Sequence, residues 1–190
     1  DSPELNAAIE AQNTARSGRA EQIAARLAKA GITGTLEGAQ LLAGNAYVGR
    51  PHFAQYLVNI GRVNSQQRAF DKYLGAGKPA SVAMPWTDML TALSWIKAAG
   101  GIAVLAHPAR YGLSQTKLRA LLVDFKSAGG QAMEVSTANE KVNIIQNLAT
   151  LAQRFELYAS QGSDYHGTNM PWLKLGRFAP LPANCQPVWH

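Results

Sequence analysis

The hydrophobic and polar positions of the chain change their pattern near residue 85. Before that point the apolar side chains recur at helical spacing, which predicts a mainly helical module over residues 1–85. The expected helices span residues 3–29, 36–42, 50–60 and 65–74, and a glycine-containing loop follows at 75–79. Gly31 provides the stop signal of the first helix.

After Pro85 short apolar runs alternate with amphipathic stretches, which indicates strands between helices. We expect helices at 87–100, 114–129 and 141–155, followed by strands at 102–106, 132–135 and 157–160, respectively. Thr87 is the expected N-cap of the first of these helices, and Ser114 or Thr116 begins the second. Three rounds of helix and strand predict an α/β fold with parallel strands, although three strands are too few to close a barrel.

The composition is that of a globular protein, since 47% of the 190 residues are hydrophobic and 16% are charged. No apolar run approaches the roughly 18 residues of a membrane span, and the N-terminus lacks a basic segment followed by an apolar one. The single cysteine, Cys185, excludes an internal disulfide framework and fits the reducing cytoplasm, where we expect the protein. The net charge of +6 favours anionic partners such as nucleotides or RNA.

Two of the expected strands end in residues that can bind a metal ion. His107 follows the apolar strand 102–106, and Asp164 and His166 follow the strand at 157–160. Side chains two positions apart in an extended segment point the same way, so Asp164 and His166 can converge at a strand end. A lone histidine at a strand terminus is more simply explained as hydrogen-bonded, but the second strand end makes a Zn, Mn or Fe site the better hypothesis.

Several other polar residues have more than one explanation. Glu134, inside the expected strand 132–135, could orient a ligand histidine, or it could face solvent or cap a helix. Arg110 could supply a guanidinium fork for a phosphate. The candidate anion-binding cations of the helical module are Arg16, Arg19, Arg50, His52 and Lys78. For each of them a solvated surface position explains the residue at least as well. The glycines at 75–77 match no Walker pattern, and no Gly-x-Ser-x-Gly motif is present.

Two motifs carry a resemblance to a known family. Residues 106–111, Ala-His-Pro-Ala-Arg-Tyr, and residues 161–166, Gln-Gly-Ser-Asp-Tyr-His, resemble the third and fourth motifs of the PHP (polymerase and histidinol phosphatase) superfamily. The closest subgroup comprises bacterial 3′,5′-nucleoside bisphosphate phosphatases and related 5′-to-3′ exoribonucleases. The likeness also includes Arg19-Ala20, Ile23-Ala24, Arg50-Pro51-His52-Phe53-Ala54, Lys72-Tyr73-Leu74, Gly77-Lys78-Pro79, Gly129-Gly130, Glu134-Val135, Leu175-Gly176-Arg177 and Leu181-Pro182. It therefore extends over nearly the whole chain.

The resemblance implies a distorted (β/α)₇ barrel with a helical insertion and up to three divalent ions. Residues 1–85 would then be the insertion module, and residues 86–190 the C-terminal half of the barrel. Mn²⁺ is the expected ion, with Zn²⁺, Fe²⁺ or Mg²⁺ as alternatives. The positions that match catalytic metal ligands are His107, Asp164 and His166. Those that match nucleotide contacts are Arg19, Arg50, His52, Lys78 and Arg110, whereas Ser81 stands where the family usually has an aromatic residue.

The chain also departs from the family. The first family motifs are a His-x-His strand, an Asp-His-Asp segment, a strand glutamate and a further histidine, and nothing in this sequence matches them. The chain begins at Asp1, about where those motifs would end. We therefore expect an incomplete fragment that lacks an N-terminal half-barrel or a partner chain.

These features together predict a metal-dependent phosphoesterase that hydrolyses phosphate esters of nucleotides. The expected reaction is removal of the 3′-phosphate from a 3′,5′-bisphosphonucleotide, or 5′-to-3′ exoribonuclease action on an RNA 5′ end, or both. The fragment alone is expected to be inactive. Two alternatives stay open, namely a non-catalytic basic module that binds nucleotides or RNA, and an amidohydrolase-like metal enzyme.

Overall fold

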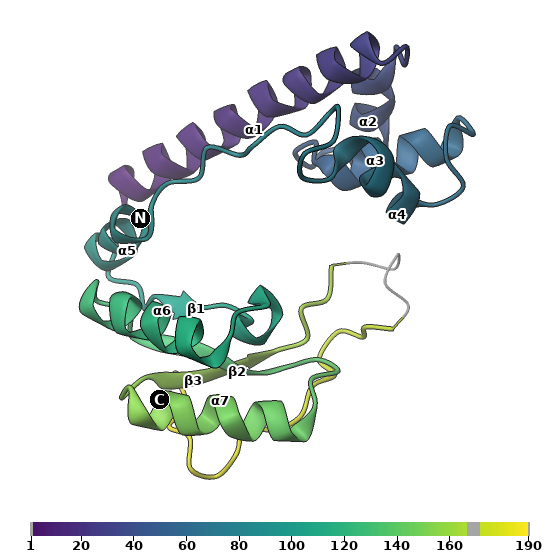
Figure 1. Ribbon diagram of the computed structural model, residues 1–190. Coiled ribbons are helices and arrows are strands. Elements are labelled where there is room, and N and C mark those ends of the chain that lie inside the picture. Colours follow the sequence, from purple (N-terminus) through teal and green to yellow (C-terminus); the bar gives the residue numbers. More distant parts are fainter. Residues whose placement is uncertain (1, 167–171, 190) are drawn as a thin grey trace. The chain divides into compact units, whose positions relative to one another are not determined.

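The computed structural model describes residues 2–166 and 172–189 (Figure 1). The chain divides into two compact units, with the division between Trp86 and Thr87. The first unit, Pro3–Trp86, is helical. The second combines helices with a small sheet. No helix in the described part of the chain is both long enough and apolar enough to cross a membrane.

The helical unit closes around one apolar core. Its elements are α1 (Pro3–Lys29), α2 (Thr35–Ala43), α3 (Arg50–Asn59), α4 (Gln66–Ala69) and the π-helix η1 (Phe70–Leu74). Leu27, Phe53, Leu57 and Leu74 are fully buried in this core. The helix expected over 65–74 is divided into α4 and the π-helix η1. At the end of η1 the backbone hydrogen bond spans five residues, because the Gly75 N–H donates to the Phe70 carbonyl at 2.8 Å.

The segment after η1 returns along α1 (Figure 1). Ala80 and Val82 are buried in the core of the unit. The Arg19 Nε donates to the Val82 carbonyl at 2.8 Å, and the Arg26 guanidinium donates to the Ser81 carbonyl. Side chains of α1 therefore fix this extended segment, because its carbonyls have no strand beside them to donate a hydrogen bond.

The second unit alternates helices and parallel strands. Its elements are α5 (Met89–Ala98), β1 (Val104–Leu105), the 3₁₀ helix η2 (Pro108–Tyr111), α6 (Gln115–Ser127), β2 (Ala132–Thr137), α7 (Val142–Arg154) and β3 (Tyr158–Gly162). The strands pair in the order β1-β2-β3, all parallel, with Val104 opposite Ala132 and Ala132 opposite Tyr158. The α/β prediction is confirmed. The sheet of the described residues is open, and residues 186–188 hydrogen-bond to Ala159 along the outer side of β3.

Two local predictions need correction, and one holds. The strand expected at 102–106 shortens to Val104–Leu105, because the Ala106 carbonyl accepts the Tyr111 hydroxyl at 2.6 Å instead of a neighbouring strand. The N-cap of α5 is Asp88 and not Thr87, since the Asp88 carboxylate accepts the Thr91 N–H at 2.9 Å. Ser114 is confirmed as the N-cap of α6.

Candidate active site

His107 lies two residues beyond β1, in a strained turn. Its φ of 33° places a non-glycine residue in the left-handed region, which costs energy unless the surroundings hold it. The Glu134 carboxylate provides that support, because its Oε2 accepts the His107 backbone N–H at 2.7 Å. A residue of β2 therefore fixes the turn that follows β1.

Glu134 contacts the main chain of the candidate ligand. Its carboxylate accepts the backbone N–H of His107, which is the N-cap residue of the 3₁₀ helix η2, so its position combines two of the predicted alternatives, support of a ligand histidine and a helix cap. On the other side lies Gly162 of β3, where a Cβ would come within 3.1 Å of Glu134 Oε1. The absence of a side chain at Gly162 leaves room for the carboxylate between the two strand ends.

The imidazole of His107 is partly enclosed. Among the described residues its Nδ1 is buried and has no hydrogen-bond partner. The ring meets Tyr111 edge to face, with 5.9 Å between the ring centroids. Burial, and then the negative charge of Glu134, raise the pKa of Tyr111, so its hydroxyl stays a proton donor to the Ala106 carbonyl. An enclosed nitrogen without a partner has its lone pair available for a metal ion or a substrate proton.

Asp164 and His166 do lie together, but not for the predicted reason. Strand β3 ends at Gly162, and Asp164 has a φ of 49°, so the alternation of an extended segment does not continue to these residues. The left-handed turn at Asp164 instead accompanies a contact of 2.9 Å between its Oδ1 and the His166 Nε2. The expected neighbours are correct, and the geometry assigned to them is wrong.

Arg110 connects the two strand ends. Its Nη1 forms an ion pair with Asp164 Oδ2, and its Nη2 donates to the Ala138 carbonyl at 3.4 Å. Beside this pair is a pocket of about 300 Å³. The residues that line it are Arg110, Ala138, Asn139, Glu140, Asp164, Trp172 and Leu173.

Three of these lining residues were missed by the sequence reasoning, namely Asn139, Glu140 and Trp172. The signal for Asn139 and Glu140 was present, because polar residues directly after a parallel strand lie at the functional edge of a sheet. Asn139 has a φ of 61°, and its Nδ2 donates to the Trp172 carbonyl at 2.9 Å. No local pattern pointed to Trp172, which lines the pocket beside that contact.

The three predicted metal ligands do not form one cluster in this chain. Asp164 contacts His166, whereas the described contacts of His107 are with Glu134 and Tyr111. Over residues 2–166 and 172–189, no group of three or more His, Cys, Asp or Glu side chains could hold a metal ion. The available donors, an imidazole nitrogen without a partner and a carboxylate, fit a divalent ion in kind, and further ligands would have to complete the set.

The helical unit brings two of its predicted cations close together. Arg50 is the first residue of α3, and its guanidinium lies 5.7 Å from the centroid of the Phe70 ring. Burial, and then the positive charge of Arg50, lower the pKa of Arg19. Neither arginine forms an ion pair with another described residue.

The other cations predicted in the helical unit have different surroundings. His52 Nδ1 accepts the Gly49 N–H at 3.0 Å, so this nitrogen caps α3 and only the other ring nitrogen can reach a ligand. Lys78 is exposed. Arg16 lies with its guanidinium 5.5 Å from a ring centroid of Trp86, at a pocket of about 160 Å³ that Arg19 also lines.

Comparison with known proteins places this geometry in a family. No family model matches the chain. The chain is 42% identical over 188 residues to a 5′-3′ exoribonuclease of Haemophilus influenzae, covering 99% of this chain and 68% of that protein. It is 39% identical over 189 residues to a 3′,5′-nucleoside bisphosphate phosphatase of Chromobacterium violaceum, with 99% and 66% covered. It is 46% identical over 179 residues to the 5′-3′ exoribonuclease Rnm of Escherichia coli, with 94% and 61% covered.

Two solved structures share the fold of this chain. The structure of an amidohydrolase from Chromobacterium violaceum, with bound sulfate and no metal, superposes with a TM-score of 0.87 at 39% identity, over 99% of this chain and 66% of that one. A candidate metal-dependent phosphoesterase from Bifidobacterium adolescentis superposes with a TM-score of 0.71 at 26% identity, over 94% and 61% of the two chains.

The similarity in sequence and in fold places the chain among phosphoesterases of the PHP type. Within that class, the chain belongs to the family of bacterial 5′-3′ exoribonucleases and 3′,5′-nucleoside bisphosphate phosphatases. It spans about two thirds of the length of the curated relatives it matches.

Proposed function

We propose that the protein hydrolyses phosphate esters of nucleotides as part of a metal-dependent phosphoesterase. The observation that carries this proposal is the meeting of Arg110, Asp164 and His166 beside a pocket at the strand ends. An arginine fork can bind a phosphate, and a carboxylate–imidazole pair can hold a metal ion or move a proton during phosphate-ester hydrolysis. The proposed substrates are a 3′,5′-bisphosphonucleotide, an RNA 5′ end, or both, because the relatives carry the names of these two activities.

The proposed metal ligands of this chain are His107, Asp164 and His166, and Mn²⁺ is the proposed ion. Divalent ions, when bound, lower the pKa of bound water and neutralise phosphoryl oxygens. The chain's own residues hold the site together. Glu134 fixes the turn that carries His107, and Arg110 neutralises Asp164. Further ligands would come from an N-terminal half-barrel or from a partner chain, either of which would also complete the open sheet into a distorted (β/α)₇ barrel.

The proposed role of the cations is to bind phosphate. Arg19, Arg50, Arg110 and Lys78 would bind the phosphate that is not hydrolysed, which would give specificity for a second phosphate. Burial, and then the positive charge of Arg50, lower the pKa of Arg19, and two like charges close together favour an anionic ligand, which supports this role. His52 is proposed as a further contact of the nucleotide. With this substrate and a single cysteine, the cytoplasm is the proposed compartment.

The test is release of inorganic phosphate from adenosine 3′,5′-bisphosphate, and of nucleotides from a 5′-phosphorylated oligoribonucleotide, by the full-length protein with Mn²⁺. We expect release that a chelator abolishes and that added Mn²⁺ restores. RNA binding that depends on salt but not on the chelator, without any hydrolysis, would instead favour the non-catalytic module. Hydrolysis of a carbon–nitrogen bond without phosphate release would favour an amidohydrolase.

A further inference from the structure

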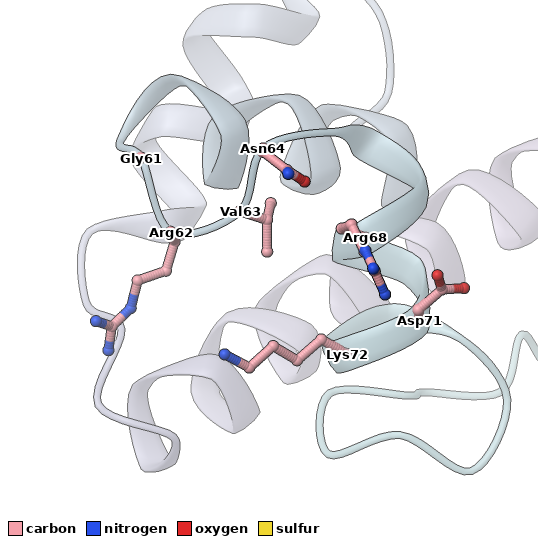
Figure 2. A pocket seen from close by; sticks show the side chains of 7 residues that line it. All are labelled: Gly61, Arg62, Val63, Asn64, Arg68, Asp71 and Lys72. Carbon is pink, nitrogen blue, oxygen red and sulfur yellow. The ribbon is translucent and has the colours of Figure 1, made fainter.

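A second basic pocket lies in the helical unit, among residues that the proposed function does not use. Its volume is about 800 Å³. The pocket, shown in Figure 2, is lined by Gly61, Arg62, Val63, Asn64, Arg68, Asp71 and Lys72. None of these residues lines the smaller pocket beside Arg16 and Arg19. The two are therefore separate places on the same unit.

The turn after α3 holds Arg62 in a defined position. The Gly61 N–H donates to the Val58 carbonyl and the Arg62 N–H donates to the Leu57 carbonyl, both at 2.9 Å. This is the Schellman arrangement, and it needs the left-handed φ of 69° that Gly61 adopts. The backbone of Arg62 is thus fixed, while its side chain is exposed to solvent (Figure 2).

Arg68 and Lys72 approach the pocket from the next two elements. Ser65 caps α4 by accepting the Arg68 N–H at 3.2 Å. Lys72 belongs to the π-helix η1, and its Nζ lies 5.2 Å from the centroid of the Tyr73 ring. A π-helical turn costs hydrogen-bond geometry, and such turns are frequent at functional sites. Figure 2 shows Lys72 reaching toward the side of Arg62, with Arg68 beside Asp71.

The charges of the pocket are not balanced within it. None of the three cations forms an ion pair with another described residue. The single carboxylate, Asp71, accepts a hydrogen bond from Gln67 at 2.9 Å through its Oδ1. The pocket thus presents three basic side chains, the amide of Asn64 and the aliphatic surface of Val63. No aromatic ring lines it, so it offers phosphate contacts but no platform on which a base could stack.

We propose that this pocket binds the phosphodiester backbone of single-stranded RNA. The choice of RNA rests on the proposed function, whereas the choice of phosphate follows from the three cations. Arg62, Arg68 and Lys72 are spread over separate elements, which suits successive phosphates of a strand better than a single one. The consequence is a preference for oligonucleotides over mononucleotides, because an oligonucleotide offers several phosphates to the three cations.

The first experiment measures binding alone. A fluorescent 12-nucleotide RNA is titrated with the full chain in the presence of a chelator, at several salt concentrations. We expect the triple variant R62Q/R68Q/K72Q to bind at least about tenfold more weakly at 0.1 M salt. Its plot of log affinity against log salt concentration should be less steep by about 2, since three contacts are lost and each contact with a single strand contributes about 0.7 to the steepness.

The matched control removes three exposed cations of the other unit, in the variant K117Q/R119Q/R154Q. An equal loss in both variants, or no loss in either, would overturn the proposal. Tripolyphosphate is the probe for a small-anion site. If the triple variant loses tripolyphosphate binding as strongly as RNA binding, the pocket recognises small anions and the proposal for an RNA strand is wrong.

A second experiment separates this inference from the proposed function. In the full-length protein the triple variant should release nucleotides from the 12-nucleotide RNA at least about fivefold more slowly, and should hydrolyse adenosine 3′,5′-bisphosphate at the normal rate. An equal loss on both substrates contradicts the inference. If the unmodified protein hydrolyses neither substrate, the proposed function has failed, and the binding titration still decides the role of the pocket.

Discussion

The Glu134 carboxylate accepts the backbone N–H of His107 at 2.7 Å, so a residue of one strand holds the turn that follows its neighbour. Glu134 lies in β2, and His107 lies beyond β1, 27 residues earlier in the chain. The left-handed backbone of His107 is stable only if something compensates its cost. This one hydrogen bond to a charged acceptor supplies such compensation at the place where the chemistry is proposed.

Substitution of Glu134 tests this relationship. Glu134→Ala should lower the free energy of unfolding by about 1–3 kcal/mol, because the His107 N–H loses its charged acceptor. Glu134→Gln should lower it less, since an amide oxygen still accepts a hydrogen bond. Urea denaturation of both variants and of the unchanged chain measures the difference. Equal losses in the two variants would show that the hydrogen bond is not the cause.

Asp164 and Arg110 should affect catalysis differently. In the full-length protein Asp164→Ala should reduce phosphate release at least about 100-fold and lower the metal content measured by plasma emission. Arg110→Gln should raise KM for a bisphosphonucleotide about tenfold or more while metal remains bound, because it removes the fork for phosphate. Arg119→Gln, an exposed change on α6, is the control. Normal activity of the Asp164 variant would contradict the assignment of the site.

Two glycines of the helical unit should respond in opposite directions to alanine. Gly38 of α2 lies against Tyr56 of α3, and a Cβ at Gly38 would overlap the tyrosine ring. Gly38→Ala should therefore destabilise the unit by about 1–3 kcal/mol. Gly18 of α1 has open space where a Cβ would be, so Gly18→Ala should stabilise it by up to about 1 kcal/mol. Thermal unfolding followed by circular dichroism distinguishes the two signs.

The N-cap of α5 should depend on pH. The backbone N–H of Thr91 is the main cause that lowers the pKa of Asp88, so the folded state favours the carboxylate. The stabilisation is then fully present above the unfolded pKa of about 3.9 and is lost as pH falls through the lower folded pKa. Asp88→Ala should lower the melting temperature at pH 7, and the difference should shrink below about pH 4. Asp124→Ala, an exposed change on α6, is the control for the removal of a surface carboxylate.

Much of the local structure could be read from the sequence, because its signals are local. The helical periodicity of residues 3–29 gave α1, the Arg-Pro-His run gave the start of α3, and Ser114 gave the cap of α6. The carboxyl ends of parallel strands indicated His107 and Asp164 as site residues. The cap of α5 was predicted one residue too early. Asp88 caps α5 because its side chain reaches Thr91, and the neighbouring Thr87 looked equally suitable from sequence.

The sequence by itself determined the α/β class, the order of the elements and the residue types at the strand ends, since these depend on side-chain periodicity and on short motifs. Only the tertiary structure decided which of those residues meet. Arg110 pairs with Asp164 across 54 residues, and the register of β2 sets Glu134 beside β3, with an irregularity between Glu134 and Ser136. Such contacts depend on strand register and on left-handed turns at His107 and Asp164, which packing imposes and no local pattern encodes.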